Sequence, residues 1–244
     1  MTKHFYAMQN FLLIHGGSHG AWCWKSCITA LEVADHRATA IDLAGHGLDK
    51  TPRDSVTTRS YVEAVCEQLK QYRGPPLTLV GHSLAGVILP EIIGRHPEKV
   101  AEVVFLAAIV LEVGECALDY IPPDRRPIYF ERAAASGDNT FLVDYEVARR
   151  IFFSDLPESA ARRHYQQLTP QPLAIYLERA EIDPSAIACP KRYIVCRDDQ
   201  ALSYEACLRF GERLGGPIVQ IASGHDAMLS EPEDLAQLLT HKAG

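Results

Sequence analysis

The feature of the sequence that most constrains its fold is an apolar strand that runs directly into a serine turn. Leu77–Val80 (LTLV) carries no charge, and Gly81–Gly86 (GHSLAG) follows it at once. Small residues on both sides of a serine permit a sharp strand-to-helix turn that exposes the hydroxyl group. Ala85 stands where the usual signature has a second glycine, and alanine is small enough for the same turn. The segment predicts a buried strand, a nucleophile at Ser83 and a helix that is kinked at Pro90.

Short apolar runs alternate with longer segments of helical periodicity along most of the chain. The candidate helices lie near residues 20–33, 58–72, 84–95, 201–213 and 232–241. The candidate strands, several of them apolar almost throughout, are Phe11–His15, Arg37–Asp42, Leu77–Gly81, Val103–Ala108, Lys191–Cys196 and Pro217–Ala222. Such alternation is typical of a parallel sheet with crossover helices, and continuous apolar strands indicate cover on both faces. The sequence therefore predicts an α/β fold with about six mostly parallel strands flanked by helices.

One interval breaks this rhythm. Residues 110–187, between the fourth and the fifth candidate strand, form too long a segment for a simple crossover. Helical patterns occur within it near residues 141–153 and 157–168. We interpret the interval as an inserted lid over the carboxyl ends of the strands, where open α/β sheets bind ligands; a long structural loop is the alternative. Residues 1–109 and 188–244 would then form the core domain.

Composition and charge exclude several classes of function. The formal net charge is −7, which argues against binding to nucleic acid or to an anionic membrane. No run of about 18 apolar residues or signal peptide is present, so no membrane association is expected. The seven cysteines are odd in number and form no CxxC pair, which predicts reduced thiols and a cytoplasmic location. The sequence leaves the oligomeric state open, a homodimer included.

Candidate partners for Ser83 follow the last two candidate strands. His225 lies directly after the final strand, where the chain order serine, acid, histidine places a general base. A carboxylate after the preceding strand would accept the other ring N–H of this histidine and stabilise the imidazolium ion. Asp198 and Asp199 both occupy that position, and Glu112 after the fourth strand is a weaker third candidate. Reasoning from the residues alone does not separate the two aspartates.

An acyl-transfer enzyme also needs two N–H donors for the oxyanion of its tetrahedral intermediate. The backbone N–H of Leu84, directly after the candidate nucleophile, is one. Gly17, in the His15-Gly16-Gly17 loop after the first strand, is the candidate for the other, although a pair of glycines after a strand can simply form a turn. His15 and His19 are spaced four residues apart but straddle glycines in a loop, so we expect no metal site.

In this order, the motifs resemble those of the plant methylesterase and hydroxynitrile lyase family of α/β-hydrolases, which includes salicylic-acid-binding esterases. The resemblance covers nearly the whole chain but is weak between residues 111 and 140. It implies the α/β-hydrolase fold and places Asp199 at the position of the catalytic acid. The matching segments are His15–Trp22 (HGGSHGAW), Ala40–Ala44 (AIDLA), Gly81–Leu84 (GHSL), Tyr193–Asp199 (YIVCRDD) and Gly224–Pro232 (GHDAMLSEP).

The same resemblance separates esterases from lyases at three positions. The lyases have a threonine where this chain has Gly16, a cysteine where it has Leu84, and a lysine where it has Asp226. The lysine stabilises departing cyanide, which an aspartate would oppose. All three positions predict an esterase.

The leading hypothesis is a carboxylesterase for small-molecule esters that uses no cofactor and no metal. Ser83 is its nucleophile, His225 its base and Asp199 its acid, and the N–H groups of Gly17 and Leu84 form the oxyanion hole. A lactonase, a thioesterase or a C–C bond hydrolase could use the same residues. A ligand receptor that binds small acids or lactones under the lid, with slow hydrolysis, is an alternative of another class.

Overall fold

The computed structural model describes residues 8–241, and its centre is a parallel sheet of six strands. In spatial order the strands are β2 (Arg37–Ile41), β1 (Asn10–Ile14), β3 (Leu77–His82), β4 (Val100–Leu106), β7 (Lys191–Cys196) and β8 (Ile218–Ile221). Every neighbouring pair is parallel, so all six strands end at the same edge of the sheet. The α/β fold and the six strands predicted from the sequence are confirmed.

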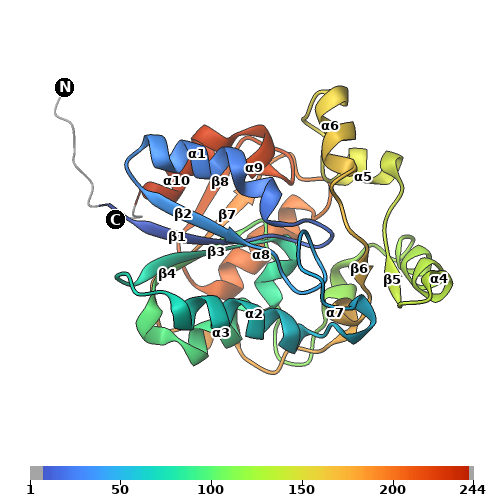
Figure 1. The fold of residues 1–244 in the computed structure, drawn as a ribbon, viewed down its shortest axis with the longest axis horizontal. Coiled ribbons are helices and arrows are strands. Elements are labelled where there is room, and N and C mark those ends of the chain that lie inside the picture. Colours follow the sequence, from blue (N-terminus) through green and yellow to red (C-terminus); the bar gives the residue numbers. More distant parts are fainter. Residues whose placement is uncertain (1–7, 242–244) are drawn as a thin grey trace.

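Helices cover both faces of this sheet (Figure 1). On one face α1 (Lys25–Val33), α9 (Ala227–Ser230) and α10 (Pro232–Thr240) enclose an apolar cluster that includes Trp24, Leu31 and Leu235. On the other face α2 (Thr58–Gln71), α3 (Leu89–Arg95) and α8 (Tyr204–Leu214) enclose a larger cluster. Burial on both sides explains why the strands are apolar without alternation.

The helix expected over residues 84–95 is divided. Ser83–Val87 forms a 3₁₀ helix, and α3 begins only at Leu89. Pro90 therefore lies in the first turn of α3, where the backbone N–H that proline lacks has no partner within the helix. The prediction of a kinked continuous helix is wrong, since the proline starts a second helix instead.

Residues 110–187, here called the insertion, contribute no strand to the six-stranded sheet in the part of the chain that is described. They contain α4 (Arg126–Ser136), α5 (Tyr145–Ile151), α6 (Glu158–Tyr165), α7 (Ala174–Leu177) and a small antiparallel pair, β5 (Thr140–Phe141) and β6 (Gln171–Pro172). Figure 1 shows the insertion beside the end of the sheet at which the strands finish. Two of its helices were predicted; α4, which is capped by Gly137 with φ of 81°, was not.

Close contact between the turn after β3 and the loop after β4 fixes the geometry of this edge. A Cβ atom on Gly86 would lie 2.2 Å from the carbonyl oxygen of Ile109. The N–H of Ile109 also donates to the carbonyl oxygen of Ser83 at 3.0 Å. Only glycine allows the two backbones to approach this closely.

We expect Gly86→Ala to lower the free energy of unfolding by about 2 kcal/mol or more, because the methyl group meets backbone that cannot move aside. Gly94→Ala is the matched control, since a Cβ atom on Gly94 of α3 meets nothing within 4 Å. It should be neutral or stabilising by roughly 0.5–1 kcal/mol. Denaturant unfolding of the two variants measures the difference, and equal stabilities would contradict this account.

Candidate active site

Ser83 occupies a strained position at the end of β3. Its φ is +52°, in the left-handed region that residues with a Cβ rarely adopt, at a cost of order 1–3 kcal/mol. The preceding His82 is extended, and the 3₁₀ helix starts at Ser83 itself. The half-buried side chain therefore projects from a sharp turn, as predicted from the small residues around it.

Three predicted site residues form one hydrogen-bonded chain. Nε2 of His225 lies 2.9 Å from Oγ of Ser83, and Nδ1 of His225 lies 2.7 Å from Oδ2 of Asp199. His225 is 1% exposed and Asp199 8%, so water competes little for either bond. Ser83 follows β3, Asp199 follows β7 and His225 follows β8, which brings residues far apart in sequence to one edge of the sheet.

The two aspartates left open by the residues differ sharply in their surroundings. Oδ1 of Asp199 accepts hydrogen bonds from the backbone N–H groups of Ala201 at 2.7 Å and Leu202 at 3.0 Å. These bonds fix the carboxylate while Oδ2 faces His225. Asp198 is exposed, and Glu112 is exposed and paired with Arg213. Asp199 is therefore the acid in contact with the histidine.

Carboxylates around His225 change its proton affinity. Burial alone would lower the pKa of His225, but the Asp199 carboxylate raises it, and Asp226 and Asp155 add to this effect. The net result is a pKa above the ordinary value. A more basic imidazole accepts a proton from serine more readily.

The loop after β1 passes very close to the serine turn. A Cβ atom on Gly16 would lie 2.8 Å from Cβ of Ser83, so no side chain fits there without displacement. Nδ1 of His15 donates to the carbonyl oxygen of Gly16 at 2.8 Å, and Nε2 of His15 accepts from the N–H of Leu43 at 3.0 Å. Burial lowers the pKa of His15 to about 4, which keeps it neutral. Because a trans peptide directs its N–H away from its C=O, this anchor fixes the direction of the Gly17 N–H.

A buried ionic cluster lies beside the histidine, and the sequence did not reveal it. Asp226 is fully buried, and its Oδ2 lies 3.0 Å from Nε2 of His19, whose Nδ1 lies 2.8 Å from the carbonyl oxygen of Gly17. Both neighbours are acceptors, so both contacts are hydrogen bonds only if each ring nitrogen carries a proton. Burial would raise the pKa of Asp226, but His19 lowers it below its usual range. The Asp226 charge is thus compensated internally, which weakens its predicted effect on departing cyanide.

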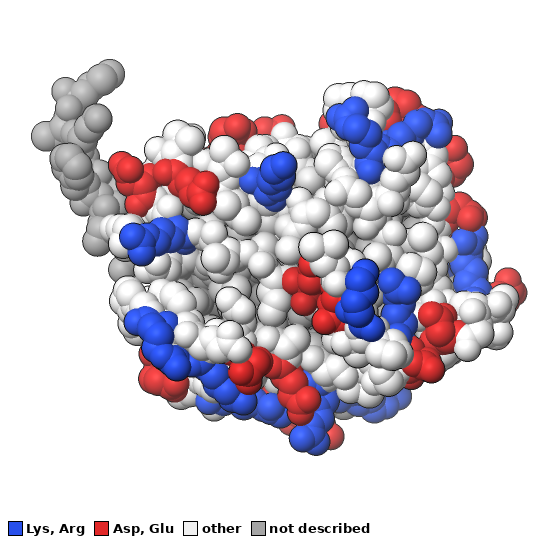
Figure 2. Space-filling view, in the orientation of Figure 1, with Lys and Arg blue, Asp and Glu red and all other residues white. Residues whose placement is uncertain are grey.

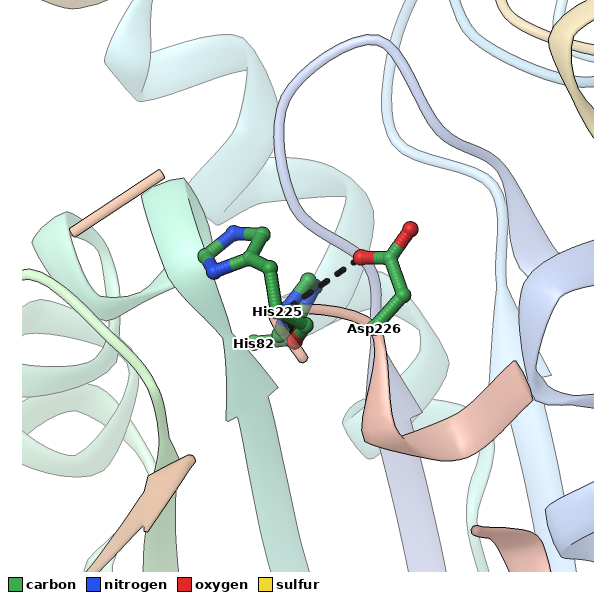
Figure 3. Close-up of side chains that lie close together, drawn as sticks. All are labelled: His82, His225 and Asp226. Atoms are coloured by element: carbon green, nitrogen blue, oxygen red, sulfur yellow. Dashed lines mark hydrogen bonds and ion pairs between the residues drawn. The ribbon is translucent and has the colours of Figure 1, made fainter. Parts of the chain in front are cut away.

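The third member of this region is His82, which Figure 3 shows beside His225 and Asp226. Nε2 of His82 donates to the backbone oxygen of His225 at 3.1 Å and lies 3.7 Å from Oδ1 of Asp226. Ligand-type atoms of these three residues lie within 4.8 Å of one another. Both ring nitrogens of His225 already face Ser83 and Asp199, however, so a metal ion here would have to displace the hydrogen bonds of the serine.

The insertion contacts the loops that carry His225 and Gly17. Oδ2 of Asp155 accepts from the N–H of Gly224 at 2.6 Å, directly before His225. The Phe152 ring centroid lies 5.9 Å from that of His225. Near Gly17, the Tyr176 hydroxyl would lie 3.3 Å from a Cβ atom at that position, and the Tyr176 ring packs against two further aromatic rings, those of Tyr129 and Phe141. The segment from α4 to α7 therefore places aromatic rings beside His225 and Gly17.

A separate cavity of about 400 Å³ lies beside the end of the 3₁₀ helix and the start of α3. It is lined by Gly86, Val87, Pro90 and balanced charged side chains, including Arg59, Arg95, Glu91 and Glu181. Neither Ser83 nor His225 nor Asp199 lines it.

The surface charges and the lengths of the helices can be compared with the sequence-based expectation that the protein binds neither nucleic acid nor membrane. On the face in Figure 2, basic and acidic side chains are intermixed. Within residues 8–241, no helix combines the length and the apolarity that a membrane span requires. Neither observation conflicts with the exclusion of nucleic acid and membrane partners.

Comparison with known proteins places the chain among hydrolases. Probable esterase PIR7A of Oryza sativa subsp. indica is 30% identical over 258 residues, covering 95% of each chain. Methyl jasmonate esterase 1 of Vitis vinifera is 28% identical, again over 95% of each chain. An extracellular alpha/beta-hydrolase from a Paenibacillus species has a TM-score of 0.87 at 25% identity and covers 95% of this chain and 97% of its own. The predicted resemblance to plant methylesterases is confirmed by these relatives.

The family model described as "Alpha/beta hydrolase family" matches residues 11–238, a range that includes Ser83, Asp199, His225 and the whole insertion. The chain belongs to the alpha/beta hydrolase family.

Proposed function

We propose that the protein hydrolyses small-molecule carboxylic esters with Ser83 as nucleophile, His225 as general base and Asp199 as the acid that orients it. The observation that carries the proposal is the unbroken series of hydrogen bonds from Oγ of Ser83 through His225 to Asp199. Relatives with esterase and methylesterase names agree with it.

In the acylation step, Oγ of Ser83 attacks the ester carbonyl carbon while Nε2 of His225 takes its proton. Asp199 holds the other ring N–H and stabilises the imidazolium. The backbone N–H groups of Gly17 and Leu84 donate hydrogen bonds to the carbonyl oxygen, which carries the negative charge of the tetrahedral intermediate. The imidazolium then protonates the leaving alcohol, and an acyl-serine ester remains.

Water completes the cycle by the same route. His225 removes a proton from the water molecule, whose oxygen attacks the acyl carbon, and the second tetrahedral intermediate uses the same two donors. Collapse of this intermediate releases the carboxylic acid, and the imidazolium of His225 returns the proton to Oγ of Ser83. These steps need only groups on this chain, so the mechanism uses no cofactor or metal.

The insertion acts in this proposal as the lid that shapes the substrate pocket. Because Tyr176 lies beside Gly17 and packs against Tyr129 and Phe141, the proposed pocket favours a substrate with an apolar or aromatic portion. Lactone, thioester and C–C bond substrates remain alternatives with the same residues. A ligand receptor with slow hydrolysis differs from an enzyme in kinetics: a burst from an activated aryl ester followed by steady turnover identifies an enzyme.

The cytoplasmic location and the oligomeric state of the protein remain predictions. The seven cysteines are all free, which fits a reducing compartment such as the cytoplasm. Relatives include proteins named as chloroplastic and a structure described as extracellular, so the family does not favour one location. A homodimer remains a hypothesis, which a measurement of the molecular mass in solution tests.

Ser83→Ala should lower turnover of an aryl ester by a factor on the order of 10⁶ and leave the thermal unfolding temperature nearly unchanged. The exposed Ser55→Ala variant is the control and should keep wild-type turnover. A fluorophosphonate should label wild-type protein and Ser55→Ala but not Ser83→Ala. Wild-type turnover by Ser83→Ala would contradict the mechanism.

The acidic limb of the pH profile of kcat/KM should reflect the pKa of His225, because the imidazole must be neutral to act as a base. Because its pKa is raised, activity should fall as the pH drops through a value above 6.5. Asp155→Asn removes one of the charges that raise this pKa and keeps an oxygen for the N–H of Gly224. The limb should therefore move to lower pH in this variant, and a shift to higher pH would contradict the electrostatic account.

We expect no useful hydroxynitrile lyase activity. Gly16 has no hydroxyl group to hold a cyanohydrin oxygen, and the Asp226 carboxylate stands where the lyases have lysine. The comparison is cyanide release from mandelonitrile against hydrolysis of a small aryl ester by the same purified protein. Enzyme-dependent cyanide release at a rate comparable to ester turnover would refute the esterase assignment.

A further inference from the structure

The peptide between Gly17 and Ser18 is held at both of its polar atoms by side chains. Its carbonyl oxygen accepts from Nδ1 of His19 at 2.8 Å, and its N–H donates to Oε1 of Gln171 at 2.9 Å. Ser18 itself has φ of +64°, a left-handed conformation that persists only where neighbours enforce it. This peptide directly follows the N–H that we assign to the oxyanion hole.

Gln171 reaches this loop from the insertion. It lies in β6, whose pairing with Phe141 of β5 fixes its backbone, and its side chain is fully buried. Its Nε2 group donates to the hydroxyl of Tyr61 on α2 at 3.1 Å and to the backbone oxygen of Pro172 at 3.2 Å. Because Oε1 also accepts from the N–H of Ser18, hydrogen bonds fix the orientation of the Gln171 side-chain amide at both its oxygen and its nitrogen.

The network continues until it returns to Ser18. The Tyr61 hydroxyl accepts from Gln171 and therefore donates to Nε2 of His46 at 2.6 Å. Nδ1–H of His46 then donates to Oγ1 of Thr169 at 2.7 Å, and this hydroxyl donates to the carbonyl oxygen of Ser18 at 3.3 Å. The N–H of Thr169 also donates to that oxygen, at 2.8 Å.

Every donor in this circuit has an acceptor when His46 is neutral. Burial holds the pKa of His46 well below its usual range, which agrees with that protonation state. His46 is fully buried and Tyr61 is 2% exposed, so a broken bond would leave polar atoms without water. The circuit therefore has one consistent direction and resists local rearrangement.

We propose that Gln171 is a positioning residue for the oxyanion hole. Its carbonyl group fixes the Gly17–Ser18 peptide from the side of the insertion, while His15 fixes the preceding peptide from the core. Together the two anchors set the direction of the Gly17 N–H before substrate binds. The insertion thus takes part in transition-state stabilisation as well as in enclosing the substrate. This inference rests on the proposed esterase function.

Gln171→Met removes the acceptor for Ser18 at similar length. We expect kcat for an aryl ester to fall about 10- to 100-fold, since a misplaced oxyanion donor costs turnover, with KM changed less than about threefold. Gln167→Met, on an exposed glutamine of the same insertion, is the matched control and should keep wild-type kcat.

A pair of inhibitors separates an oxyanion effect from a general loss of structure. A trifluoromethyl ketone forms a tetrahedral adduct with the serine, so its inhibition constant should rise by the same factor as kcat falls. The corresponding amide binds without an adduct, and its inhibition constant should stay within about threefold. Parallel weakening of both compounds, an unchanged kcat, or a higher KM alone would overturn the proposal.

Amide hydrogen exchange at Ser18 provides a readout that needs no activity. Exchange should be faster in Gln171→Met than in wild type or Gln167→Met, and equal rates would overturn the proposed anchor. If Gln171→Met does not fold, Gln171→Asn, which withdraws the acceptor by one methylene, is measured in its place. Absence of ester turnover and fluorophosphonate labelling in wild-type protein would instead contradict the proposed function, whatever the exchange rates.

Discussion

The site depends on the positive φ of Ser83 at the end of β3. This conformation turns the chain sharply, so the hydroxyl projects beyond the sheet while the backbone continues into the 3₁₀ helix. The strain is offset by close packing around the turn, where Gly16 and Gly86 allow neighbouring backbones to approach. Because all six strands are parallel, the residues that follow β1, β7 and β8 end at the same edge and surround this turn.

Buried charge is the second constraint on this edge. His225 and Asp199 form one buried pair, and His19 and Asp226 form another beside it. Removing one partner from such a pair leaves an uncompensated charge away from water, which costs several kcal/mol. Asp226 therefore has two roles in the electrostatics: it pairs with His19, which holds the Gly17 carbonyl oxygen, and it raises the pKa of His225. The loop that carries Gly17 and the imidazole of His225 are thereby linked through a single carboxylate.

Much of this arrangement follows from local sequence. Apolar runs predict the strands because both faces are buried, and small residues around Ser83 predict the turn because a larger side chain would clash. Long-range pairings carry no such local signal. Nothing in the sequence around Asp226 indicates His19, which lies 207 residues away, and nothing around Gln171 indicates Ser18. Even the choice between Asp198 and Asp199 required either a family resemblance or the direction of a side chain. The kink predicted at Pro90 is absent because the position of this proline within its helix depends on where the 3₁₀ helix ends, which the local sequence does not indicate.

The insertion divides into two parts with different physical tasks. Asp155, Thr169 and Gln171 form hydrogen bonds to the backbone of the loops that carry His225 and Gly17, so their positions are tied to the geometry around Ser83. The α4 region supplies Tyr129 to the aromatic group near Gly17, and its sequence is also where the family resemblance is weakest. The aromatic side chains of this region make none of these backbone hydrogen bonds, so they can change with little effect on the geometry around Ser83. An insertion divided in this way allows the proposed substrate pocket to change its apolar lining while the hydrogen bonds around Ser83 are kept.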